Sequence, residues 1–307
     1  MTVQEQAVLR TISALALLGA PPTLAELYQH FDQGLDAIKD ISLSSSAIEV
    51  TLRSLCERQI LKLVRGRYLL SDLGVDLESM LTGEEWMPRK LRKARKVASW
   101  LARLAGVRAV FLCNRTAFGL PHDEGDLDFF VIVRHGSIWQ TRGFAGLPFV
   151  LLRDRPKAGT KERDVVCLSF FLSDQALDLV PCLLKPDDVY FRHWFLGLLP
   201  LVDDGVMQEL WEANQKLHAR HPFAKTWLVS PDLRVSVPYL RIPVSSWLER
   251  FGRLLQTKYF PRALRERANQ DTRVMISDRH LKFHIDDGRE VVQKRYQELC
   301  ERYGIVA

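Results

Sequence analysis

The chain has 307 residues, a formal net charge of +6, 47% hydrophobic residues and 26% charged residues. This composition is typical of a globular protein with two or three domains, and it excludes an intrinsically disordered chain. The basic excess fits a polyanionic partner such as a nucleoside triphosphate or a nucleic acid, and it fits a solvated basic surface equally well.

The five cysteines are widely spaced and form no Cys-x-x-Cys pair. We therefore expect reduced thiols and no zinc site. The sequence shows no N-terminal signal, and its apolar runs are too short to cross a bilayer. These features predict a cytoplasmic protein without a membrane partner.

Residues 1–78 predict a first unit of three helices followed by a β-hairpin. Apolar spacing predicts helices over Gln4–Leu18 and Ser44–Arg58. A helix between them begins at Thr23, where Glu26 completes a capping box. The hairpin spans Ile60–Leu70. This layout resembles winged helix-turn-helix domains. The resemblance implies a third helix in the DNA major groove, with Arg65 and Arg67 at phosphates. A protein-contact role or a purely packing role remains the alternative.

A connector is expected over Asp72–Glu85, followed by an amphipathic helix from Met87 to Leu104 whose first half is strongly basic. The basic segment, residues 89–96, lies directly before the predicted sheet. It is therefore a candidate to guide nucleic acid or triphosphate, and the alternative is an ordinary solvated helix face.

Residues 79–175 predict a sheet and residues 176–307 a mainly helical unit, so the expected fold class is α+β. The expected strands are Gly106–Cys113, Leu127–Val133, Phe149–Arg153 and Val165–Leu172. The expected later helices are Ala176–Leu184, Val189–Leu199, Gly205–Arg220, Ser246–Tyr259 and Gly288–Arg302.

Two aspartates, Asp126 and Asp128, stand at the start of a strongly apolar strand. Because side chains alternate along a strand, both carboxylates point to the same side. Adjacent carboxylates repel each other and are costly to bury unless a cation lies between them. Hard oxygen ligands of this kind suit Mg²⁺, or Mn²⁺, so the pair predicts a metal site. The alternative is a solvated polar strand end.

In this part of the chain, an apolar strand is followed by a loop with small residues and by Asp126-Leu127-Asp128 on a second strand. This pattern resembles the polymerase-β-type nucleotidyltransferase superfamily. The loop Asn114–Gly119 is similar to the Gly-Ser-x-Ala-x-Gly loop of that family. The resemblance implies a mixed nucleotidyltransferase-fold sheet, two-metal catalysis with a nucleoside triphosphate as substrate, and a triphosphate loop formed by Asn114, Arg115, Thr116 and Gly119. The alternative for the loop is a tight turn that only joins two strands.

Two features depart from the family pattern. Asn114-Arg115 replaces Gly-Ser, and Cys167 occupies the position of the third carboxylate. A cysteine is a poor substitute for a hard anionic Mg²⁺ ligand. Asp164, just before the last predicted strand, is the preferred replacement, and Asp174 is the weaker one.

A later segment, Leu281–His284, resembles larger bacterial and archaeal relatives of unknown substrate. The resemblance implies that Ser277–Asp287 closes over the site, and the alternative is a short strand with polar turns.

The sequence therefore favours an enzyme that transfers a nucleoside monophosphate to an unknown hydroxyl. Asp126, Asp128 and Asp164 are its expected catalytic residues, and Asp126 and Asp128 are its expected metal ligands. The alternative is a catalytically degenerate domain that senses nucleotides or acts as a scaffold on a winged-helix regulator.

Overall fold

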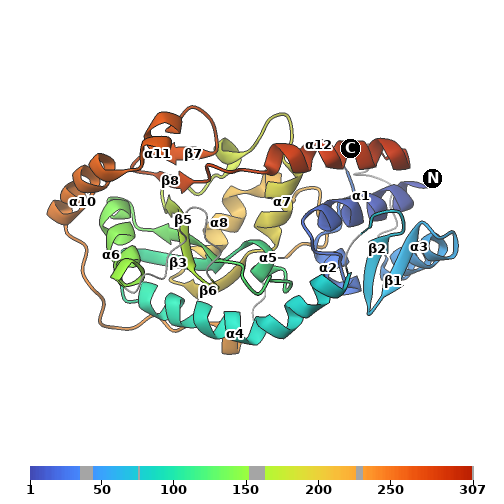
Figure 1. The fold of residues 1–307 in the computed structure, drawn as a ribbon, viewed down its shortest axis with the longest axis horizontal. Helices are drawn as coiled ribbons and strands as arrows, with labels where there is room; N and C mark the ends of the chain where they lie inside the picture. Colours follow the sequence, from blue (N-terminus) through green and yellow to red (C-terminus); the bar gives the residue numbers. More distant parts are fainter. Residues whose placement is uncertain (35–43, 75–76, 152–162, 226–230, 306–307) are drawn as a thin grey trace.

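The computed structural model describes residues 1–34, 44–74, 77–151, 163–225 and 231–305, and shows a mixed α+β protein (Figure 1). The α-helices are α1 (Val3–Leu17), α2 (Leu24–Gln29), α3 (Ser45–Glu57), α4 (Leu77–Leu101), α5 (Asn114–Ala117), α6 (Ile138–Leu151), α7 (Val189–Leu196), α8 (Met207–Ala213), α9 (Gln215–His218), α10 (Ser246–Tyr259), α11 (Arg262–Arg267) and α12 (Arg289–Tyr303). The strands are β1 (Leu61–Val64), β2 (Arg67–Leu70), β3 (Val107–Leu112), β4 (Leu127–Val133), β5 (Val166–Ser173), β6 (Leu199–Asp203), β7 (Val274–Ile276) and β8 (His280–Phe283). Two short 3-10 helices, η1 (Val180–Cys182) and η2 (Pro231–Leu233), complete the described elements.

A six-stranded sheet in the order β6-β3-β4-β5-β8-β7 forms the centre of the molecule. Strands β4 and β5 run parallel, and the other neighbouring pairs are antiparallel. A parallel pair requires a crossover, which α6 supplies between β4 and β5. This arrangement brings the starts of β4 and β5 to the same end of the sheet, where the candidate site lies.

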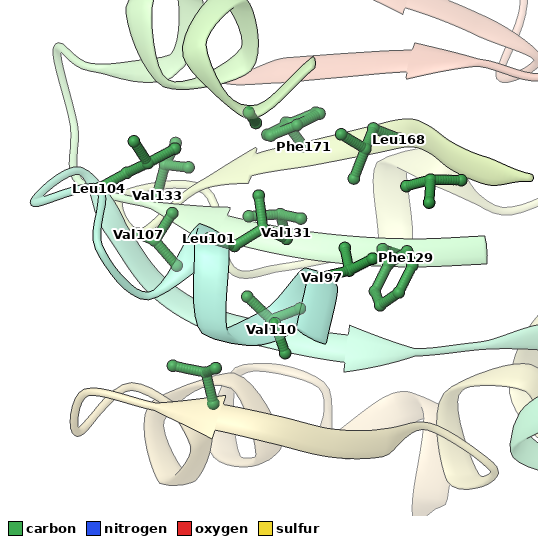
Figure 2. Close-up of a cluster of buried hydrophobic side chains, with 14 of the residues drawn as sticks. Val97, Leu101, Leu104, Val107, Val110, Phe129, Val131, Val133, Leu168 and Phe171 are labelled. Carbon is green, nitrogen blue, oxygen red and sulfur yellow. The ribbon is translucent and has the colours of Figure 1, made fainter. Parts of the chain in front are cut away.

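Helices cover both faces of the sheet. On one face, α4 and α6 pack against side chains such as Val110, Val131 and Phe171 (Figure 2). On the other face, α7 and α8 pack against Phe130 and Ile132. Because both faces of the central strands are buried, these strands are almost continuously apolar instead of alternating with polar residues.

The predicted first helices and the hairpin are confirmed. Thr23 and Glu26 form the expected capping box, and Thr2 forms a second one with Glu5 at the start of α1. The hairpin turns at Arg65 and Gly66, which both have positive φ angles of 49° and 78°. This geometry suits a two-residue turn between strands with a right-handed twist.

The N-terminal helices share their core with the end of the chain. Helix α12 packs Tyr296, Leu299 and Cys300 into the same apolar cluster as α1 and α3. Figure 1 shows α1 and α12 side by side, with both termini at the same end of the molecule. The described N-terminal helices therefore share their core with a helix more than 200 residues away in the sequence.

Several sequence expectations are wrong. The segment Asp72–Glu85 contains the first part of α4, which runs without interruption through Pro88. Residues 149–151 of the expected strand Phe149–Arg153 belong to α6, and residues 152–153 lie outside the described residues. The expected helix Val189–Leu199 ends at Leu196, and Leu199 begins β6.

The later chain also differs from its expected helices. Only the short η1 forms within Ala176–Leu184, and the expected helix Gly205–Arg220 is divided into α8 and α9 at Asn214. Strands β6, β7 and β8 all come from residues 176–307, so a boundary at residue 175 would divide one sheet between two units. Within the described ranges, we find no helix with the length and apolar character needed to cross a membrane.

Candidate active site

A cavity of about 520 Å³ opens at the end of the sheet where β4 and β5 begin. Its walls come from β4, β5, the segment after β8, and helix α7. The polar and charged side chains that line it are Asn114, Asp126, Asp128, Ser169, Tyr190, Lys282, His284, Asp286, Asp287 and Arg289. The volume is within the usual range for small-molecule sites. Three of the residues expected from the sequence, Asn114, Asp126 and Asp128, therefore meet at one cavity.

Asp128 is held in place by a chain of hydrogen bonds. The Asn114 amide nitrogen donates to Asp128 Oδ2 at 2.8 Å, and the Tyr190 hydroxyl donates to Asn114 Oδ1 at 3.1 Å. Asn114 has a φ of 58°, a left-handed conformation that asparagine tolerates better than most residues. The turn after β3 thus aims an amide at the carboxylate.

The two aspartates carry negative charge that the surrounding protein compensates only weakly. Burial raises the pKa of Asp128, and the hydrogen bonds from Asn114 and Cys167 and the charge of Lys90 only partly oppose this rise. Burial and the neighbouring charge of Asp128 raise the pKa of Asp126, against a smaller opposing effect of Lys90. A cation bound between the carboxylates would relieve both effects.

Strand β5 presents Cys167 and Ser169 to the cavity. Cys167 is the register partner of Asp128, and an irregularity in the pairing follows between Asp128 and Phe130. Burial, followed by the charge of Asp128, raises the pKa of the Cys167 thiol, so the thiol is neutral at pH 7. Ser169 Oγ lies 3.0 Å from His284 Nε2. The position beside the aspartate pair therefore holds neutral groups and no third carboxylate.

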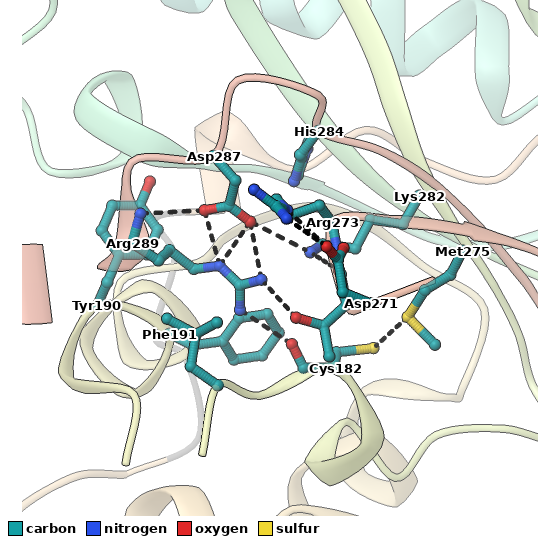
Figure 3. Close-up of polar contacts among 12 residues, drawn as sticks. Cys182, Tyr190, Phe191, Asp271, Arg273, Met275, Lys282, His284, Asp287 and Arg289 are labelled. Atoms are coloured by element: carbon teal, nitrogen blue, oxygen red, sulfur yellow. Dashed lines mark hydrogen bonds and ion pairs between the residues drawn. The ribbon is translucent and has the colours of Figure 1, made fainter. Parts of the chain in front are cut away.

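The opposite wall carries an ion-pair cluster (Figure 3). Arg289 binds Asp188 at 2.7 Å and Asp287 at 2.8 Å, and Lys282 Nζ lies 3.8 Å from Asp287. Burial, followed by the nearby charge of Arg289, lowers the pKa of Lys282 to about 8. Burial, followed by the charge of Lys282, lowers the pKa of His284 to about 4, so this imidazole is neutral at pH 7.

The rest of the expected triphosphate loop does not line this cavity. The Arg115 guanidinium lies against Gly19, and Arg115 Nε donates to the Leu120 carbonyl at 3.3 Å. Thr116 is buried in the short α5. Gly119 has a φ of 78°, as the turn requires, and stands in open space.

Asp164, the expected third carboxylate, lies in a different environment. Its oxygens bind Lys90 Nζ at 2.7 Å and Arg89 Nε at 2.7 Å. Burial raises the pKa of Asp164, but the hydrogen bonds and charges of these two cations outweigh burial and hold the pKa below its ordinary value. Asp174 is also occupied, because it binds Arg108 at 3.2 Å. Neither residue lines the cavity.

Some of the arginines and lysines that were expected to contact phosphate instead form ion pairs within the protein. Arg67 is buried and binds Glu26 at 2.9 Å and Glu84 at 3.2 Å, whereas Arg65 is exposed. In the segment 89–96, Lys90 is fully buried against Asp164. Arg92, Arg95 and Lys96 remain on the exposed face of α4.

The sequence reasoning did not expect Ser169 on β5, or Tyr190 and Arg289 on the opposite wall. All three lie far from Asp128 in the chain. Lys282–Asp287, in contrast, belongs to the segment Ser277–Asp287 that was expected over the site. The structure shows both a strand, β8, and, directly after it, a segment that lines the cavity.

Comparison with family models, with curated proteins and with solved structures finds no match to this chain. Among the described residues, no group of three or more His, Cys, Asp or Glu side chains is arranged to hold a metal ion. The candidate site thus has to be interpreted from its own geometry and chemistry.

Proposed function

We propose that this protein is a nucleotidyltransferase that depends on Mg²⁺ or Mn²⁺ and transfers a nucleoside monophosphate from a triphosphate to a hydroxyl. In this proposal the central sheet is a nucleotidyltransferase fold, and residues 1–78 form a winged helix. The observation that carries the proposal is the pair Asp126 and Asp128, two carboxylates with raised pKa values at the wall of one cavity.

The donor set fits one divalent cation. Asp126 and Asp128 would hold it through carboxylate oxygens, which suit Mg²⁺ and Mn²⁺. When bound, such a cation neutralises charge on the triphosphate. The Asn114 amide fixes the orientation of Asp128 before any ligand arrives. Lys282 lies on the opposite wall, where its buried ammonium donates to the Thr272 carbonyl and adds positive charge near the cavity.

A second candidate function is nucleotide binding without transfer, as in a sensor or scaffold on a winged-helix regulator. One observation favours it: the position next to Asp128 on β5 is the neutral thiol of Cys167. Two-metal transfer commonly places a second cation about 4 Å from the first. The other carboxylates that line the cavity, Asp286 and Asp287, come from the opposite wall, and Asp287 is paired with Arg289. Among the described residues they form no three-membered metal-binding group with the aspartate pair.

Label transfer tests the proposal. The protein would be incubated with each α-labelled nucleoside triphosphate, Mg²⁺ or Mn²⁺, and cell extract. We expect transfer by the native protein and loss of at least about a hundredfold in Asp126→Asn/Asp128→Asn, because the cation ligands are removed. Asp232→Asn, at an exposed aspartate away from the cavity, is the matched control.

The same incubation separates the two candidates. A triphosphate that raises the melting temperature with Mn²⁺ but gives no labelled product would support the sensor and contradict the transferase. A salt-dependent gel shift on duplex DNA would test the winged helix, and absence of binding at low salt would favour a protein-contact role.

A further inference from the structure

Helix α10 exposes its apolar side chains, unlike the helices that cover the sheet. Trp247, Phe251, Leu254 and Leu255 are spaced to share one helix face, and they are 66%, 49%, 70% and 45% exposed. The rings of Trp247 and Phe251 are stacked with their centroids 5.5 Å apart. None of the residues of α10 is buried.

Helix α10 is held to the protein by its polar face. Glu249 accepts hydrogen bonds from the backbone N–H groups of Trp139 and Gln140, at 3.1 and 2.8 Å, at the start of α6. Gln256 donates to the Trp139 carbonyl at 2.6 Å. Gly252 lies between them and lets the two helices approach closely. Polar residues and a glycine therefore form the contact with α6.

This orientation is the reverse of the usual one. An amphipathic helix on a globular protein normally buries its apolar stripe and exposes its charges. Here the anchors Glu249 and Gln256 fix the helix with its apolar stripe toward solvent. Contiguous exposed apolar surface of this kind marks a contact site for another molecule.

Charge identifies the kind of partner. Residues 250–265 contain five cations, Arg250, Arg253, Lys258, Arg262 and Arg265, and no Asp or Glu. Arg253 is paired with Asp278 and Arg262 with Glu266, so the positive charge offered to a partner comes from Arg250, Lys258 and Arg265. Trp247 and Tyr259 lie near the two ends of the helix, and Tyr259 is 69% exposed. A helix with Trp, Phe and Leu on one face and Arg and Lys beside it suits the surface of an anionic membrane. Such a helix lies in the interface and does not span the bilayer.

We propose that α10, with the cations of α11, binds the protein to the surface of an anionic lipid membrane. Trp247, Phe251 and Leu254 would enter the headgroup boundary, while Arg250, Lys258 and Arg265 contact lipid phosphates. Figure 1 places α10 at the end of the molecule away from both termini, so the remaining body can stay in solution. This proposal does not depend on the proposed transferase activity.

Co-sedimentation with vesicles tests the proposal on the full chain. The native protein should bind vesicles of phosphatidylcholine with phosphatidylglycerol, and bind vesicles of pure phosphatidylcholine at least about tenfold more weakly. Phe251→Glu/Leu254→Glu should reduce binding at least about tenfold. Val50→Glu/Leu63→Glu is the matched control, since these apolar side chains are 64% and 56% exposed elsewhere on the protein, and it should bind normally.

A charge variant, Arg250→Gln/Lys258→Gln, should weaken binding to the anionic vesicles and reduce its sensitivity to salt. Equal binding to both vesicle types would overturn the assignment of an anionic surface. Absence of vesicle binding by the native protein would overturn the membrane proposal. A native dimer that Phe251→Glu/Leu254→Glu converts to a monomer, without vesicle binding, would assign the surface to a second copy instead.

Discussion

Asp128 and Asp164 lie near the starts of the two parallel strands β4 and β5, yet their surroundings are opposite. Asp164 has two cations within 2.7 Å, whereas Asp128 is hydrogen-bonded to a neutral amide and lies beside a neutral thiol. The pKa of Asp164 is lowered, and that of Asp128 is raised. A carboxylate neutralised within the protein acts as a structural anchor, while one left without a strong counter-charge is suited to bind an external cation.

The largest expected effect is on protein stability and concerns Asp164, the structural anchor. Lys90→Met should lower the free energy of unfolding by about 3 kcal/mol, because Asp164 would lose the buried partner of its ion pair. Urea denaturation would measure this loss. Lys96→Met, on the exposed face of the same helix, should change stability by less than about 0.5 kcal/mol.

A double-mutant cycle sharpens this prediction. If Lys90 acts through Asp164, Lys90→Met/Asp164→Asn should lose less stability than the sum of the two single variants. Additive losses would show that the two residues act independently and would remove Asp164 from its role as anchor.

The next effect concerns the cation site. Mn²⁺ at about a hundred times its dissociation constant should stabilise the native protein by about 2.7 kcal/mol. Asp126→Asn/Asp128→Asn should abolish this gain, because amides do not supply the anionic oxygens. Thermal unfolding with and without Mn²⁺ measures both. An equal gain in the variant would place the cation elsewhere.

A smaller effect is expected when an anionic oxygen is added beside the aspartate pair. Cys167→Asp places a third carboxylate at the register partner of Asp128. It should tighten Mn²⁺ binding about tenfold, or about 1.4 kcal/mol, and lower stability in the absence of the cation through charge repulsion. Calorimetric titration measures the affinity. Cys167→Asn, which adds an oxygen without the charge, is the control.

The smallest effect is a dependence on pH. Because the pKa values of Asp126 and Asp128 are raised above 3.8, their charged forms destabilise the folded state at pH 7, and this penalty disappears as pH falls through the raised values. Asp126→Asn/Asp128→Asn should therefore be slightly more stable than the native protein at pH 7, without a cation. The difference should shrink toward pH 4, as urea denaturation at several pH values would show. A difference that grows toward pH 4 would contradict the raised pKa values.

Local patterns in the sequence predicted the helices and hairpin of residues 1–70 because periodicity and capping residues act over a few positions. The same reasoning failed at β6, since a short apolar run that follows a helix does not reveal whether it continues that helix. It failed at Phe149 because the apolar end of α6 has the composition of a strand. Pairing across the sheet, which decides both cases, cannot be read from neighbouring residues.

The residues themselves predicted the candidate site only where they are close in sequence, and the distant segment Lys282–Asp287 was expected there only through the family resemblance. Asn114, Asp126 and Asp128 belong to one strand-turn-strand segment, and all three line the cavity. The state of Asp164 depends on Lys90, which lies 74 positions earlier in the chain. No pattern near Asp164 indicates this partner, so only the folded structure separates an anchor from a potential ligand.

The pairing of α1 with α12 has a consequence for synthesis on the ribosome. Helix α1 is synthesised nearly 300 residues before the side chains that complete its core, such as Tyr296 and Leu299. Strands β7 and β8 also arrive late, and with them the wall that carries Lys282 and His284. The nascent chain should thus hold an incomplete cavity until β8 and α12 have been synthesised, and a product truncated before β7 should present an uncovered N-terminal surface.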